Sequence, residues 1–287
     1  MHLRGEIDLP ECPVMTSDFS YDPVTAVDEA SATGEVAEIF ADIRQTMRIP
    51  LVTSIWRGLA GMGDSLETVW RATKPIYLSE LPEISLARIV EQTDLPMPEP
   101  LVPAQLARAG IDEEQLRAIR TVVEAYSRSN GLNMVALYAL ISPEVGRRET
   151  LQPSARPLWG HFPPLLAQEA LDANTWQLIR HANAFGAPGD NASVATLWRH
   201  LGHWPSLLSL IYSGLAPHHA GGAITAAARQ MVELTRLEAS NLAAWREGAP
   251  QLSEQARQTI AGYVTTPWQV VRMVVLGHTL ARWLPST

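Results

Sequence analysis

The chain has 287 residues, of which 46% are hydrophobic and 18% are charged, and this composition is typical of a globular protein. Its net charge of −8 without a basic run argues against nucleic-acid binding, because phosphate contacts need clustered Lys and Arg. The single cysteine, Cys12, excludes a disulfide framework and a thiolate metal cluster. We expect a cytoplasmic protein that does not enter membranes, since no apolar run approaches roughly 18 to 20 residues and no apolar signal core follows Met1.

The N-terminal part of the chain is predicted to consist of an extended segment followed by helices. Residues 1–30 carry scattered prolines and acids and form the extended segment, and residues 31–142 form a first helical half. Prolines in 81–103 argue against a long regular element there. Apolar residues at helical spacing predict helices over these ranges: 34–43, a first motif from 52, 66–73, 112–126 and 134–141.

The C-terminal part is predicted to be a second helical half that follows a linker. Residues 143–165 are rich in proline and form a linker that wraps across the surface, and residues 166–287 form the second half. No segment shows the alternation typical of a β-sheet, so the fold class is all-α. The predicted helices cover 171–184, a second motif ending at 202, 205–215, 223–245, 253–263 and 268–284.

A short stretch of sequence occurs twice, about half the chain length apart. The first copy is Val52–Ala60 (VTSIWRGLA) and the second is Val194–Gly202 (VATLWRHLG). Val, Trp, Arg and Leu are identical, and the other pairs exchange small or aliphatic residues, except that Gly58 stands opposite His200. Because internal similarity at a fixed spacing indicates a duplicated unit, we predict two pseudo-symmetric halves with a cavity between them.

Two arginines in the repeated stretches are the first candidates for chemistry. Arg57 and Arg199 each follow a Trp in an otherwise apolar helix. They could face a shared cavity and bind a carboxylate, or each could be a structural arginine bonded to helix C-terminal carbonyls or to an acid of the other half. His200 and His203 share a helical face, but no third metal ligand is evident, so we expect no metal and no other cofactor.

Residues 41–50 (ADIRQTMRIP), the two W-R-x-L segments and Trp204-Pro205 resemble the group I 2-haloacid dehalogenases, also called halocarboxylic acid dehydrogenase-like proteins. The resemblance runs from about residue 31 to the C-terminus. It implies an all-α fold with two pseudo-symmetric halves and an active site between them. It also implies hydrolysis of 2-haloalkanoic acids of either configuration to 2-hydroxy acids, without a metal or an ester intermediate.

The resemblance also assigns positions to the residues of the family's site. The family's aspartate activates water for direct displacement of halide at C2, and an asparagine assists it. Carried over by position, the asparagine falls on Asn130, a serine on Thr196 and the aspartate on Leu197. Two aromatic pocket positions fall on Leu51 and Ser54. Leucine cannot accept a proton, so this chain departs from the family at the residue that its reaction requires.

Three hypotheses for function follow. The first is a hydrolase acting on a small 2-substituted carboxylic acid, with Asp190 as the replacement acid; the structural alternative for Asp190 is an N-cap before the second motif helix. The second is a catalytically inactive protein that binds a small carboxylate or another anion through Arg57 and Arg199. The third is a structural homodimer module without a ligand.

Overall fold

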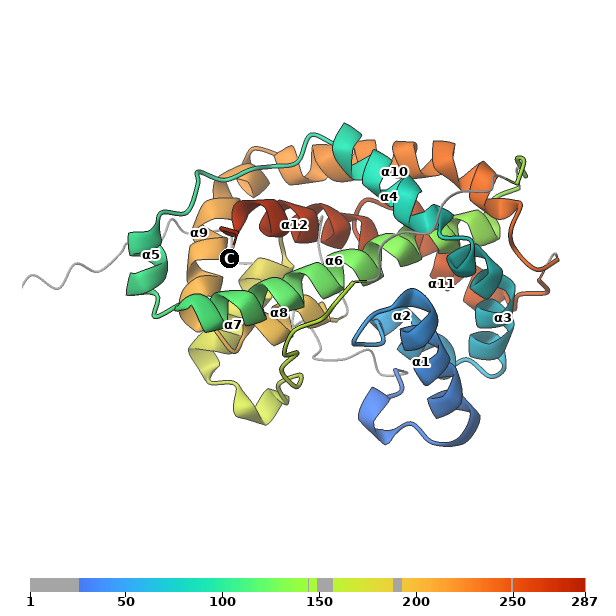
Figure 1. The fold of residues 1–287 in the computed structure, drawn as a ribbon, viewed down its shortest axis with the longest axis horizontal. Helices are drawn as coiled ribbons and strands as arrows, with labels where there is room; N and C mark the ends of the chain where they lie inside the picture. Colours follow the sequence, from blue (N-terminus) through green and yellow to red (C-terminus); the bar gives the residue numbers. More distant parts are fainter. Residues whose placement is uncertain (1–25, 144, 149–156, 188–192, 249, 287) are drawn as a thin grey trace, which may run out of the picture.

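The computed structural model describes residues 26–143, 145–148, 157–187, 193–248 and 250–286. These residues form α-helices and two short 3₁₀ turns, and no β-strand occurs among them, which confirms the predicted all-α class (Figure 1). Within the same ranges, no helix combines the length and apolar character that crossing a bilayer requires.

The N-terminal part begins with a 3₁₀ turn, η1 (Glu29–Ser31). Its helices are α1 (Gly34–Met47), α2 (Ser54–Ala60), α3 (Ser65–Leu78), α4 (Leu81–Gln92), α5 (Pro103–Arg108) and α6 (Glu113–Ile141). The C-terminal part begins with a second turn, η2 (Gln168–Ala170). Its helices are α7 (Ala173–Asn183), α8 (Thr196–Leu201), α9 (Pro205–Ala220), α10 (Ala223–Ala243), α11 (Glu254–Thr265) and α12 (Val270–Trp283).

Two predictions of local structure were wrong. The proline-containing range 81–103 holds the regular helix α4, because Pro82 lies in its first turn, where a missing N–H costs nothing. The separate helices predicted around 112–126 and 134–141 are one continuous helix, α6. Gly131 lies inside α6 without ending it, and a Cβ there would lie 2.4 Å from Leu86 Cδ2, so glycine allows α4 to approach closely.

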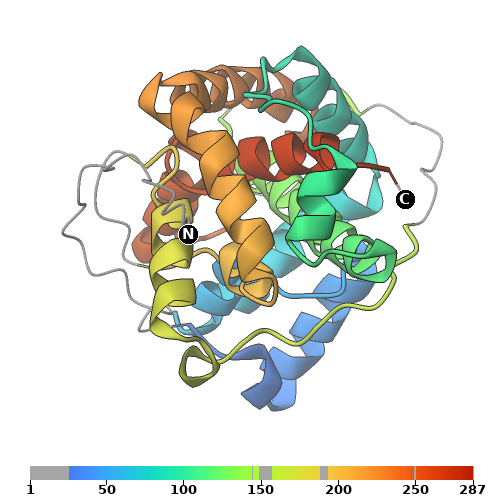
Figure 2. The ribbon, with the colours of Figure 1, turned by 90° about the vertical axis from the view of Figure 1, so that its left-hand side faces the viewer.

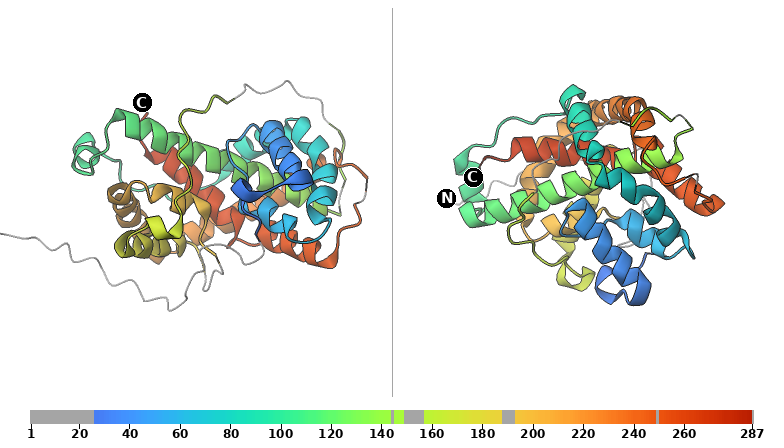
Figure 3. Two further views of the ribbon diagram at one scale, coloured as in Figure 1. Left: turned by 90° about the horizontal axis from the view of Figure 1, so that it is seen from below. Right: turned by 45° about the vertical axis from the view of Figure 1, so that its right-hand side comes forward.

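Helix α6 is the central element of the fold. It contacts α3, α4, α8, α10, α11 and α12, and it runs beside α12 in Figures 1 and 3. The two ends of α6 enter different hydrophobic cores. Residues 132–140 pack with α1 to α4 and with parts of α10, α11 and α12. Residues 116–126 pack with α7, α8 and α9, which lie at the end of the molecule that faces the viewer in Figure 2.

Several helix boundaries recur at one fixed offset along the chain. Helices α2 and α8 begin at Ser54 and Thr196, at the same offset that separates Trp56 from Trp198. The starts of α4 and α10 and the ends of α6 and α12 are separated by that offset too. Each core nevertheless takes helices from both sequence halves, so the halves interlock. Their pseudo-symmetric relation in space, and the division at 143–165, remain predictions.

Candidate active site

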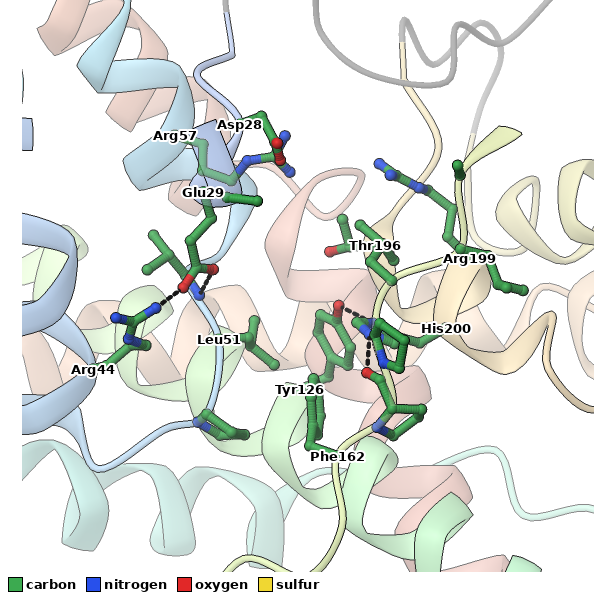
Figure 4. A pocket seen from close by; sticks show the side chains of 18 residues that line it. Asp28, Glu29, Arg44, Leu51, Arg57, Tyr126, Phe162, Thr196, Arg199 and His200 are labelled. Atoms are coloured by element: carbon green, nitrogen blue, oxygen red, sulfur yellow. Dashed lines mark hydrogen bonds and ion pairs between the residues drawn. The ribbon is translucent and has the colours of Figure 1, made fainter. Parts of the chain in front are cut away.

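A cavity of about 580 Å³ lies between the two motif helices, α2 and α8. Turn η1, α1, the chain before α2, α6 and residues 162–167 complete its wall (Figure 4). This volume falls in the range of about 300 to 1,000 Å³ that is usual for small-molecule sites. The second part of the segment predicted as a linker therefore lines a cavity.

Arg57 and Arg199, the equivalent arginines of the two motifs, both line this cavity. Their exposed fractions are 4% and 3%. They extend toward the cavity from opposite sides, Arg57 from α2 and Arg199 from α8 (Figure 4). Arg57 Nε donates a hydrogen bond of 2.9 Å to the carbonyl of Val27. Arg57 therefore makes a structural contact with the backbone in addition to lining the cavity.

Two carboxylates also line the cavity, and one of them is fully engaged. Glu29 Oε1 forms an ion pair with Arg44 Nη1, and Oε2 accepts a hydrogen bond of 2.8 Å from the backbone N–H of Val52. Asp28, in contrast, is exposed at the cavity. Among the described lining residues, the three arginines outnumber the two acids, and the cavity therefore favours an anionic ligand.

A buried tyrosine–histidine pair forms the floor between α6 and α8. Tyr126 Oη lies 2.6 Å from His200 Nδ1, and His200 Nε2 lies 3.1 Å from the carbonyl oxygen of Pro163. A carbonyl only accepts hydrogen bonds, so Nε2 carries the proton and donates. In a neutral imidazole the other nitrogen is then an acceptor. The Tyr126 hydroxyl therefore donates to Nδ1.

The electrostatics of the cavity keep His200 neutral. Burial is the main cause that lowers the pKa of His200 to about 4; His203 and Arg199 act in the same direction, and hydrogen bonds to the backbone of Pro163 and Thr196 oppose the shift. Burial raises the pKa of Tyr126 above its ordinary value, while a hydrogen bond from Thr196 and the charges of Arg199 and Arg57 oppose that rise. Both arginines therefore act electrostatically on the tyrosine that they face.

The structure separates the sequence-predicted residues into two groups. Leu51 and Thr196 line the cavity together with the two arginines. Ser54, Asn130 and Leu197 are not among its lining residues. Asn130 is 9% exposed and lies one helical turn beyond the cavity-lining Tyr126 of α6, on the same face.

Leu197, to which the resemblance carries the family's aspartate, is 1% exposed and belongs to the apolar core between α6, α7, α8 and α9. Its side chain contributes packing to that core. Asp190, the proposed replacement acid, lies outside the described residues. Among the described residues, no cluster of three or more His, Cys, Asp or Glu side chains is arranged to hold a metal ion.

Sequence reasoning missed the roles of Tyr126, His200 and Phe162 in the cavity. The sequence singled out His200 only as a possible metal ligand beside His203, and it did not single out Tyr126 or Phe162. The sequence contained one indication that His200 has a special role. His200 and Gly58 form the one pair of the two motif stretches that is neither identical nor an exchange of small or aliphatic residues. Phe162 contacts the His200 ring at 4.8 Å between centroids, which only the folded linker could reveal.

The helices define an all-α protein with a cavity of small-molecule size among them. Solved structures of D-2-haloacid dehalogenases are similar to the chain over nearly its full length. One mutant structure matches with a TM-score of 0.73 at 17% identity, and a complex described as containing L-LA matches with a TM-score of 0.72 at 16% identity. Both comparisons cover 95% of this chain and 98% of the other chain.

Two curated proteins are similar in sequence over a shorter region. A configuration-inverting 2-haloacid dehalogenase of Alcaligenes xylosoxydans xylosoxydans is 26% identical over 113 residues, which cover 39% of this chain and 38% of the relative. An (R)-2-haloacid dehalogenase of Pseudomonas putida is 26% identical over 111 residues, 37% of each chain. No protein-family model matches the sequence. The sequence and structure matches together support assignment of the chain to the 2-haloacid dehalogenase family, as the resemblance predicts.

Proposed function

We propose that the cavity between α2 and α8 binds a small 2-substituted carboxylic acid, with the carboxylate held by Arg57 and Arg199. The observation that carries the proposal is the convergence of these two buried guanidinium groups on one cavity from the two copies of the repeated motif. Guanidinium groups match a carboxylate in both charge and geometry. The relatives are named for action on 2-haloacids, which contain this group.

The rest of the cavity fits a short aliphatic acid. Leu51, Phe162 and Pro164 supply an apolar wall, whereas Tyr126 and Thr196 supply hydroxyl groups on the α6 and α8 side. A carboxylate at the arginines would place the substituents of C2 within this mixed lining. The occupant is therefore expected to combine one negative charge with a small alkyl group and a polar substituent or halogen at C2.

Hydrolysis at C2 is the reaction proposed for this ligand, and it needs a proton acceptor other than Leu197. Asp190 remains the acid proposed from the sequence. A catalytically inactive carboxylate-binding protein is the second candidate function, and the observation that favours it is the burial of Leu197 in an apolar core. A homodimeric structural module without a ligand is the third.

Ligand-dependent unfolding tests the binding proposal. A ligand at 100 times its Kd should stabilise the folded chain by about 2.7 kcal/mol, so D- and L-2-chloropropionate and lactate should raise the unfolding temperature. Arg57→Gln and Arg199→Gln should each weaken this effect. Arg71→Gln is the charge-matched control, since Arg71 pairs with Glu67 on the exposed surface of α3. Absence of stabilisation by any of these acids would contradict the proposal.

Two further measurements separate the three candidate functions. Halide release from 2-chloropropionate and 2-bromopropionate reports hydrolysis, and an Asp190→Asn variant tests the replacement acid. Stabilisation without halide release supports the binding protein. A dimer mass in solution, combined with neither stabilisation nor halide release, supports the structural module.

A further inference from the structure

We propose that Tyr126 and His200 together accept the proton of the attacking water, in place of the aspartate that Leu197 replaces. This inference rests on the proposed function, because it requires a 2-substituted carboxylate in the cavity. In this proposal Tyr126 contacts the water, and the proton finally resides on His200. Both residues line the cavity beside Thr196 and Arg199 (Figure 4).

The first argument is the direction of the hydrogen bonds. Pro163 accepts from His200 Nε2, which leaves Nδ1 as an acceptor, and the Tyr126 hydroxyl donates to it at 2.6 Å. The tyrosine oxygen therefore gives its own proton to the imidazole and keeps its lone pairs for other donors. One donor is Thr196. A water in the cavity can be the second.

The second argument is that the described carboxylates are less suitable acceptors. Both oxygens of Glu29 already accept, from Arg44 and from the N–H of Val52. Asp28 is exposed on η1, where solvent competes for its oxygens. Tyr126 and His200, with exposed fractions of 2% and 3%, are buried in the floor of the cavity.

The third argument concerns basicity. With a pKa of about 4, buried His200 has nearly the proton affinity of an ordinary aspartate. Burial sets most of this value; His203 and Arg199 add to the shift, and the backbone of Pro163 and Thr196 opposes it. Burial also dominates at Tyr126, where Thr196, Arg199 and Arg57 lower the pKa and Glu29 raises it. A bound carboxylate offsets the arginine charges, and it therefore raises the pKa of His200 and strengthens the base when substrate is present.

The step balances without another reactant. The oxygen of water forms a bond to C2 as the carbon–halogen bond breaks, and the halide leaves with that electron pair. The water proton moves to Tyr126 Oη while the tyrosine proton moves to His200 Nδ1. The products are a 2-hydroxy acid, halide and an imidazolium that donates from Nε2 to Pro163 and later returns its proton to solvent.

Halide release by conservative variants tests the proposal. Tyr126→Phe keeps the ring and removes the oxygen, and it should lower kcat by about 100-fold or more with little change in KM. His200→Gln should lower kcat in the same way. His218→Gln is the matched control, because His218 lies in the last turn of α9 and does not line the cavity. This control should keep the wild-type kcat.

A second measurement, nitrogen NMR of His200 in the wild-type chain, does not depend on the folding of a variant. The free protein should show neutral imidazole with its proton on Nε2, and added lactate should raise the pKa of His200. A purely structural contact with Pro163 would leave that pKa unchanged.

The outcomes are distinct. Stabilisation by added 2-chloropropionate or lactate without halide release would leave the binding proposal intact and overturn the proton transfer. Absence of both would overturn both. Halide release that survives Tyr126→Phe, or a pKa of His200 that lactate leaves unchanged, would also overturn the proton transfer. Release that survives Tyr126→Phe but is lost in Asp28→Asn or Asp190→Asn would reassign the base to that acid.

Discussion

The two equivalent tryptophans of the motif helices offer a matched test of a buried hydrogen bond. Trp56 and Trp198 are both 0% exposed. Trp56 Nε1 donates to Asn133 Oδ1 at 3.1 Å, whereas Trp198 Nε1 is buried without a hydrogen-bond partner among the described residues. Replacing each by phenylalanine removes the same atoms, so the two variants differ mainly in what happens to the N–H group.

The expected magnitudes follow from that difference. Each substitution loses apolar contacts, and the cost of this loss is similar for the pair. Trp56→Phe additionally loses a hydrogen bond that contributes about 1 kcal/mol, while Trp198→Phe removes an unsatisfied donor whose burial costs about 1 to 3 kcal/mol. The free energy of unfolding should therefore fall by about 2 to 4 kcal/mol more in Trp56→Phe than in Trp198→Phe.

Urea unfolding followed by far-ultraviolet circular dichroism measures this difference, with equal m-values as the condition for comparison. A double-mutant cycle of Trp56→Phe with Asn133→Ala should give a coupling energy of about 1 kcal/mol. If Trp198→Phe proves as costly as Trp56→Phe, the assignment of the hydrogen-bonding difference is refuted.

Three further predictions concern the helical framework. Asp42 binds Lys74 Nζ at 2.7 Å, and although burial raises the pKa of Asp42, the hydrogen bonds from Lys74 and Trp70 lower it more. The ionised Asp42 should therefore stabilise the fold by about 1 kcal/mol above pH 3.8, and this stabilisation should be lost as the pH falls below 3.8. In acid titrations of stability, Asp42→Asn should remove this part of the pH dependence. Arg272 donates to three backbone carbonyls from a buried site, and Arg272→Met should lower the urea-unfolding free energy by about 3 kcal/mol; a loss below that of an exposed arginine variant would contradict this. A Cβ at Gly277 would lie 2.7 Å from Ser127 Oγ, so Gly277→Ala should destabilise the fold by about 1 to 3 kcal/mol. A Cβ at Gly262 would meet nothing within 4 Å, so Gly262→Ala should stabilise α11 by about 0.5 to 1 kcal/mol. If thermal unfolding shows the same sign of change for both variants, the effect does not come from packing.

The cavity separates the positions carried over from the family into those that line it and those that do not. Leu51 and Thr196 line the cavity, but Ser54, Asn130 and Leu197 do not. Leu197 is a core residue, and Tyr126 and His200, the pair proposed above as the proton acceptor, line the cavity in hydrogen-bond contact with each other.

The sequence alone determined the all-α class, most of the helices and the equivalence of the two motif stretches. These features are encoded locally, by apolar residues at helical spacing and by identical Trp and Arg positions. Local information was insufficient at α4 and α6. A proline in the first turn of a helix and a glycine inside a packed helix both resemble breaks until their neighbours are known.

Only the tertiary structure decided which residues share the site. The cavity combines turn η1, α2, α6, the linker and α8, and these segments lie far apart in the sequence. Its hydrogen bonds depend on the exact approach of Pro163 to His200 and of His200 to Tyr126, which no local pattern encodes. The sequence placed two arginines at matching positions of two similar stretches, and packing decided that both line one cavity together with a buried tyrosine and histidine.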